Sequence, residues 1–413
     1  MNDNGNRFFY GYVIVVSSFI IFLVVFGIHY AFGVFFKPLL AEFGWSRATT
    51  AGAYSLSWLL QGPSGIIMGK FNDRYGPRKV LTLCGIILGM GIILTTRTNH
   101  CWELYLYYGV FMGLGTGGMY VPLVSTIARW FIAKRSTMTG IAISGMGFGT
   151  FLLSPVSNYL ITSYNWRTSY IILGITLLIV VLTFAQFLRL TPKLKGQFPY
   201  GYKEIHENRV DGDIKRCSIK EAIFMFEFWM VFGIFFCFGF CLLAILVHIA
   251  PHASDIGKSA GTAAGLVAAI GIASIAGKVL FGDLGDRIGN KMIYVICFSI
   301  MFFSLLFLIQ ARQDWAIYLF SIMFGLAYGG NATSQSPLVA GLFGLQSHGI
   351  IMGAVNNGFT FGGTVGPIVI GFLFDLKGDY SLAFLVIAIV SLVGVILTLP
   401  LKVKRSVSDL HNG

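Results

Sequence analysis

GKFNDRYGPRK (69–79) recurs in altered form as GDLGDRIGNKM (282–292), with a glycine, an aspartate, an arginine and a second glycine in register. The two copies are 213 residues apart, and other landmarks keep nearly the same spacing. MGLGTGG (112–118) matches FGLAYGG (324–330) at a shift of 212. A register held over so many positions indicates that the chain consists of two copies of one unit.

Composition places both copies in a membrane. The 413 residues are 56% hydrophobic and only 11% charged, whereas a soluble domain carries about a quarter charged residues. A helix that crosses a bilayer needs about 20 mostly apolar residues. The sequence predicts twelve such runs, at 10–36, 47–70, 79–97, 102–129, 135–160, 166–189, 222–249, 259–284, 291–310, 315–341, 348–374 and 380–400.

The repeat divides these runs equally. We therefore expect an all-α membrane protein of twelve transmembrane helices in two pseudo-symmetric six-helix halves, 1–190 and 222–401. The polar segment 191–221 is predicted to be a cytoplasmic linker, and 402–413 a cytoplasmic tail. Parallel repeats of this kind place the substrate between the halves, near the middle of the bilayer.

The net charge of +12 is a signal of topology rather than of nucleic-acid binding. With both termini in the cytoplasm, the cytoplasmic segments hold 21 of the 29 lysines and arginines, in accordance with the positive-inside rule. We expect a multi-pass protein of a prokaryotic cytoplasmic membrane. The six cysteines have no spacing typical of a metal site or a disulfide framework, and no cofactor is predicted.

The repeated loop resembles a signature of the major facilitator superfamily, glycine-x-x-x-Asp-Arg-x-Gly-x-Arg/Lys, and both copies lie where that family has it. WFIAKRSTMTGIAISG (130–145) is similar to a signature of the monocarboxylate transporters and the related oxalate–formate antiporters. FFYGYVIVV (8–16) and NWR (165–167) are also common in that branch. The resemblance implies the major facilitator fold and transport of organic anions by alternating access.

Two departures from the branch concern charge. Eukaryotic monocarboxylate transporters carry an aspartate and an arginine four residues apart in the eighth helix, where this chain has Ser274 and Lys278. The oxalate–formate branch has a second cation in the eleventh helix, but 350–374 contains none. Two carboxylates would then face one fixed cation, which counts against a dicarboxylate.

Lys278 is the central candidate for substrate binding. It lies eight residues before Asp286, about 12 Å along a helix, which places it close to the middle of the bilayer. A charge at that depth needs water or a partner, and no predicted span contains an acid at comparable depth. We expect the partner to be an anionic substrate. The alternative is a lysine that reaches the cytoplasmic headgroups.

Other polar and aromatic side chains are predicted to share this site. His29 could bind substrate or carry a proton, or it could be a packed histidine at a helix interface. For His248, nearer the outer end of its helix, an interfacial role is slightly favoured over a site role. The tyrosines could donate to a carboxylate or could be core residues. The remaining predicted members are Tyr120, Ser274, Tyr328, Asn331, Asn356 and Asn357.

The repeated loop motif supplies a second group of functional candidates. We predict that its charged residues form a latch between helix ends that favours one access state. The alternative is a simple determinant of topology. The residues are Asp73, Arg74, Arg78, Asp286 and Arg287.

These observations predict a secondary active transporter, not an enzyme, because no paired carboxylates or nucleophile–base set lies at membrane depth. No GxxxxGK[ST] loop is present, so ATP is not the expected energy source. The predicted partners are a small carboxylate, such as lactate or pyruvate, protons and the lipid bilayer, and we expect a functional monomer. Proton symport and oxalate–formate-type exchange both remain open. A transporter-derived sensor is less favoured, since only a short tail follows Leu401.

Overall fold

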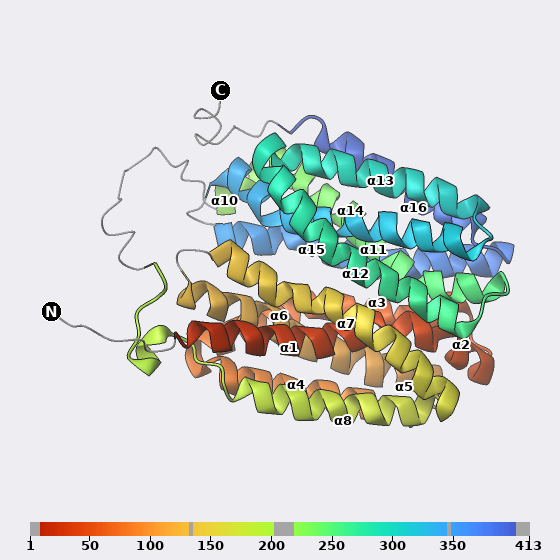
Figure 1. The fold of residues 1–413 in the computed structure, drawn as a ribbon, viewed down its shortest axis with the longest axis horizontal. Helices are drawn as coiled ribbons and strands as arrows, with labels where there is room; N and C mark the ends of the chain where they lie inside the picture. Colours follow the sequence, from red (N-terminus) through yellow and green to blue (C-terminus); the bar gives the residue numbers. More distant parts are fainter. Residues whose placement is uncertain (1–8, 132–134, 202–218, 345–347, 402–413) are drawn as a thin grey trace.

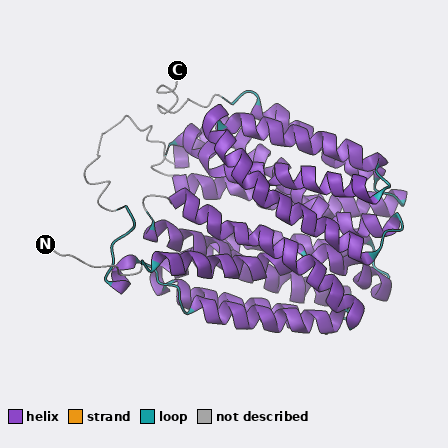
Figure 2. Cartoon of the chain, viewed as in Figure 1, coloured by secondary structure: helices purple, strands orange, loops and turns teal. Residues whose placement is uncertain are grey.

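The computed structural model describes residues 9–131, 135–201, 219–344 and 348–401. Within these ranges the regular structure is almost entirely helical, as Figure 2 shows. The exceptions to the α-helical geometry are a π-helical segment, η1 (Tyr105–Val110), a 3-10 turn, η2 (Pro192–Lys195), and one isolated bridge between Phe131 and Tyr200.

The N-terminal half contains eight α-helical segments that make six crossings of the bundle. A break at Ala31 divides the first crossing into two helices, and η1 lies within the fourth. The segments are α1 (Gly11–Tyr30), α2 (Phe32–Phe43), α3 (Arg47–Tyr75), α4 (Pro77–Thr95), α5 (Cys101–Leu104), α6 (Phe111–Trp130), α7 (Arg135–Ser163) and α8 (Trp166–Ala185).

The C-terminal half repeats this plan after a short helix. The segments are α10 (Ile219–Phe224), α11 (Phe226–Asp255), α12 (Ala260–Ile288), α13 (Asn290–Gln310), α14 (Asp314–Phe343), α15 (His348–Lys377) and α16 (Ser381–Thr398). Each long helix coincides with one of the twelve predicted runs. Ten of the crossings are long and apolar enough by composition alone to span a membrane. The other two, α3 and α14, are more polar, and several of their polar side chains are buried against neighbouring helices.

The two halves lie side by side, with the start of α1, the end of α16 and the residues after α8 at one end of the bundle (Figure 1). We call this the terminal end, and the opposite end the distal end. The halves meet where α3 packs on α15 and α7 packs on α12. The second contact is very close, because a Cβ atom at Gly271 would lie 2.8 Å from the carbonyl oxygen of Gly147. Small residues allow backbones in membranes to approach in this way.

The first part of the predicted linker is bound to the N-terminal half. The backbone N–H of Tyr200 donates to the carbonyl of Trp130 at 2.9 Å, and the Gln197 amide oxygen accepts from the N–H of Tyr10 at 3.0 Å. Residues 202–218 of the linker and the predicted tail lie outside the described residues.

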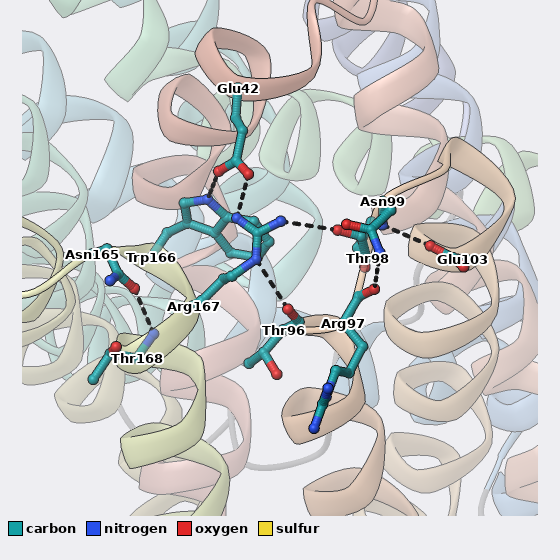
Figure 3. Close-up of polar contacts among 10 residues, drawn as sticks. All are labelled: Glu42, Thr96, Arg97, Thr98, Asn99, Glu103, Asn165, Trp166, Arg167 and Thr168. Atoms are coloured by element: carbon teal, nitrogen blue, oxygen red, sulfur yellow. Dashed lines mark hydrogen bonds and ion pairs between the residues drawn. The ribbon is translucent and has the colours of Figure 1, made fainter.

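A polar cluster holds the distal end of the N-terminal half together (Figure 3). Arg167, at the start of α8, forms an ion pair with Glu42 at the end of α2 and stacks on the Trp166 ring at 4.3 Å. Its guanidinium also donates to the carbonyls of Thr96 and Thr98, both at 3.1 Å. Three separate segments are therefore joined through one side chain.

We predict that Arg167→Ala destabilises the protein by about 2 kcal/mol, since it removes several charge-assisted hydrogen bonds. Thermal unfolding in detergent measures the loss as a lower Tm. Arg97→Ala is the matched control, because Arg97 lies in the same cluster but its exposed side chain points away from the others (Figure 3). Equal melting temperatures for the two variants would contradict the role given to Arg167.

Candidate functional site

Lys278 lies in α12 where this helix crosses α14 at very short range. A Cβ atom at Gly277 would lie 2.2 Å from the carbonyl oxygen of Leu326. The Lys278 Nζ atom is buried and has no hydrogen-bond partner in the described part of the chain. It lies 5.7 Å from the centre of the Tyr328 ring, near the outer limit of a cation–π contact. A buried ammonium without a counter-charge is costly, so this atom is equipped to receive an anion.

Three tyrosines from both halves meet beside this lysine. Tyr328, from α14, lies beside Tyr30, from α1. Tyr120, from α6, lies in the neighbourhood of both. The structure therefore brings Lys278 next to Tyr328 and places Tyr120 in the same region. Tyr30 was not among the predicted site residues, and the helix break at Ala31 beside it is visible only in the structure.

An aromatic wall adjoins the tyrosines. The Tyr30 and Trp58 rings are stacked with their centres 6.2 Å apart. The centres of the Trp58 ring and of the Phe359 ring, from the other half, lie 5.8 Å apart. Phe238 lies 6.1 Å from Tyr328. The surroundings of the lysine thus combine one cation, several hydroxyl donors and apolar ring faces.

His29 is fully buried in the contact between α1 and α3. Its ring stacks on Trp58 at 5.1 Å, and its Nε2 lies 2.9 Å from the Ser57 hydroxyl oxygen. That hydroxyl already donates to the carbonyl of Tyr54, so Nε2 carries the proton and donates to Ser57. This is the geometry of the packed interface histidine. Nδ1 has no hydrogen-bond partner among the described residues.

His248 lies near the distal end, within the C-terminal half. Its Nδ1 is 3.0 Å from the Tyr380 hydroxyl, and its Nε2 donates to the carbonyl of Pro367 at 2.9 Å. Both ring nitrogens are therefore occupied by protein partners. The structure places this residue in an interfacial network and not beside Lys278.

The predicted asparagines and Ser274 lie at helix contacts. The Asn331 side chain points to α13, where its Nδ2 lies 3.6 Å from the Met301 sulfur. The Asn357 amide donates to carbonyls of its own helix, and its oxygen faces Gly62 across the contact of α3 with α15. Ser274 donates to the carbonyl of Gly271, opposite α7. Asn356 is half-buried.

The charged loop residues form contacts inside each half. The Oδ1 atom of Asp73 lies 2.6 Å from Nη2 of Arg129, and Nη2 of Arg287 lies 2.8 Å from Oδ2 of Asp283. Arg78 donates to Gln186, and Arg74 lies over the Tyr75 ring. The Asp286 side chain lies outside the described residues. The contacts of Asp73 and Arg78 join segments of the N-terminal half, whereas those of Arg74 and Arg287 lie within one helix. A latch between the halves stays a prediction.

The family model named Major Facilitator Superfamily matches residues 18–273 and 249–411. The chain belongs to the major facilitator superfamily. A bacterial homologue of the human lysosomal transporter Spinster, solved in an inward-facing and occupied conformation, has the same fold, with a TM-score of 0.72 and 16% identity. The alignment covers 96% of this chain and 97% of that one. The predicted superfamily and fold class are confirmed.

Relatives of known name fall in the predicted branch. Rat monocarboxylate transporter 13 is 24% identical over 95% of this chain and 89% of its own length. Monocarboxylate transporter 12 of Xenopus laevis is 26% identical, over 91% of this chain and 85% of its own length. Human monocarboxylate transporter 14 is 33% identical, but this match covers only 40% of the chain and 32% of the relative. These findings support a transporter of organic anions.

We predict that Lys278→Met raises the stability of the substrate-free protein by about 1–3 kcal/mol, because it removes a buried charge that has no partner. Thermal unfolding in detergent, without added carboxylates, measures this as a higher Tm. Lys258→Met is the control, since Lys258 lies 2.6 Å from Asp314 and its loss brings no such gain. A lower Tm for Lys278→Met would show that the ammonium has a protein partner.

Proposed function

We propose that the chain is a secondary active transporter of small monocarboxylates, coupled to protons and working by alternating access. The observation that carries the proposal is the buried, unpartnered Nζ of Lys278. A carboxylate is the counter-charge that this ammonium lacks. The names of the relatives support the same class of substrate.

The residues around Lys278 supply the rest of the binding site. Its ammonium forms an ion pair with the carboxylate, and the hydroxyls of Tyr120 and Tyr328 donate to the remaining oxygen lone pairs. The rings of Trp58 and Phe359 cover the short apolar part of the substrate. A single fixed cation and apolar walls favour one carboxylate over two.

Binding at this position involves both halves. Lys278 and Tyr328 belong to the C-terminal half, whereas Tyr30 and Tyr120 belong to the N-terminal half. A substrate held by both groups sits at the boundary about which the halves rock in transporters of this design. The charged residues of the repeated loop then bias which end is open.

Proton coupling solves a problem of charge. A carrier that returns empty must move Lys278 through the cycle as an unpaired cation, at a cost typical of buried charges. In symport, the anion enters with a proton that is carried by Lys278 or by a histidine, for which the open Nδ1 of His29 is our candidate. A lysine that loses its proton together with the anion leaves the empty carrier neutral enough to reorient. Exchange is the second possibility, and the lack of a protein counter-charge at Lys278 favours it, because the unpaired lysine then forbids empty return.

The proposed orientation follows from the distribution of basic residues. The terminal end, with the linker and both termini, faces the cytoplasm of a prokaryotic cell, and the protein works as a monomer in the cytoplasmic membrane. The distal end then opens to the outside.

Uptake into proteoliposomes tests the proposal with a panel of labelled mono- and dicarboxylates. We expect Lys278→Gln to reduce uptake by about 100-fold or more, because a buried ion pair loses one partner, and Lys278→Arg to retain part of it. Lys258→Gln, which removes a cation of the same half at the distal end, keeps full uptake. Unchanged uptake in Lys278→Gln would exclude this lysine from the site.

The same liposomes separate the two coupling modes. Symport requires uptake that rises with an inward proton gradient and needs no internal anion. Exchange requires an internal anion and is insensitive to the gradient. Under symport, His29→Gln abolishes the effect of the gradient if this histidine carries the proton.

A further inference from the structure

The internal repeat places two acids at equivalent positions near the distal end. Glu42 closes α2 and Asp255 closes α11, and the two are related by the shift of 213 residues. The same shift relates Arg167 to Tyr380, at the start of the sixth crossing of each half. The acid is therefore kept in both halves, but its arginine partner is present in only one.

Each acid satisfies its charge differently. Glu42 pairs with Arg167 inside the N-terminal half, in the cluster of Figure 3. Asp255 takes its cations from the other half, since it forms ion pairs with Lys37 of α2 and, at 2.6 Å, with Arg47 of α3. The ion pair of Glu42 therefore lies within one half, whereas the ion pairs of its repeat equivalent, Asp255, join the two halves.

Arg47 lies in a socket formed by the C-terminal half. Its guanidinium lies 3.6 Å from the centre of the Phe374 ring and donates to the Tyr380 hydroxyl. Only 8% of the residue is exposed. The two oxygens of Asp375 accept the backbone N–H groups of Arg47 and Ala48 at 3.0 and 2.9 Å. An acid at a helix N-terminus also interacts favourably with the helix dipole.

His248 fixes the orientation of the Tyr380 hydroxyl. Because the His248 Nε2–H donates to a carbonyl, the Nδ1 of the neutral ring accepts from the Tyr380 hydroxyl. The hydroxyl oxygen then has its lone pairs free for the Arg47 guanidinium. The chain of donors runs from Arg47 through Tyr380 and His248 to the backbone of α15, and it gives the socket one defined geometry.

We propose that Arg47 and its socket, centred on Asp255, are the lock that holds the distal end of the transporter shut. Every described partner of the Arg47 side chain belongs to the opposite half, so the distal ends cannot separate unless Arg47 leaves the socket. Glu42 and Arg167, at the symmetry-related place, stay paired throughout the cycle. The proposal rests on alternating access but does not depend on which anion is carried.

Spin labels on the distal end measure this lock directly. Ser163, at the end of α7, and Trp315, at the start of α14, are exposed and belong to opposite halves. Both are replaced by cysteine in a protein whose six native cysteines have been removed, and pulsed electron paramagnetic resonance gives the distance distribution without substrate. We expect Asp255→Asn to increase the population with separated distal ends by about tenfold or more.

Glu42→Gln is the matched control, because it neutralises the symmetry-related acid at the same end. It is expected to lower the Tm but to leave the distance distribution unchanged. Arg47→Gln breaks the lock from the other half and gives an independent measurement if Asp255→Asn cannot be purified.

Unchanged distances in both Asp255→Asn and Arg47→Gln overturn the lock, as does an equal effect of Glu42→Gln. The proposed substrate fails in a different experiment, since a protein that transports none of the tested carboxylates still gives a distance distribution. The two proposals can therefore fail separately.

Discussion

The structure depends on the cost of placing one ammonium group in the middle of a membrane protein without a counter-charge. Lys278 is held there by a helix crossing so close that the backbones of α12 and α14 touch, and its Nζ finds no partner in the described chain. A charge at this depth needs water or a partner. We propose that an anion relieves that cost at this position, which lies near tyrosines of both halves and at the boundary between the halves.

The charged side chains at the centre and at the distal end differ in whether they have a partner of opposite charge. In the centre, the Lys278 ammonium has no hydrogen-bond partner among the described residues. At the distal end, Asp255, Arg47 and Lys37 form ion pairs, and the pairs run between the halves. The related acid in the N-terminal half, Glu42, pairs locally with Arg167. Of the two repeat-related acids, Glu42 is therefore paired within its own half, and Asp255 is paired across the boundary in a contact that is proposed to open.

The sequence was sufficient for the architecture, and it also pointed to the main candidate for substrate binding. The repeated loop and twelve apolar runs predicted two six-helix halves, because the need to satisfy backbone groups in lipid leaves few alternatives. Lys278 was found because a charge in an apolar run is conspicuous. Tyr30 was not predicted because tyrosine is common in this chain and only the tertiary structure shows that it lies beside Tyr328. Asn331 turned to α13 instead, since helical spacing gives a face but not the neighbour.

The Arg47 socket shows the same limit. The repeat relates Glu42 to Asp255 in the sequence, yet nothing there says that the second acid pairs across the halves. That information lies in how α3 meets α15 and α16, which depends on packing between segments more than 300 residues apart.

The ammonium of Lys278, which has no described partner, also has a practical consequence. Any anion that binds the folded protein there raises its stability, by about 2.7 kcal/mol at a concentration 100 times its Kd, so melting curves show which anions bind.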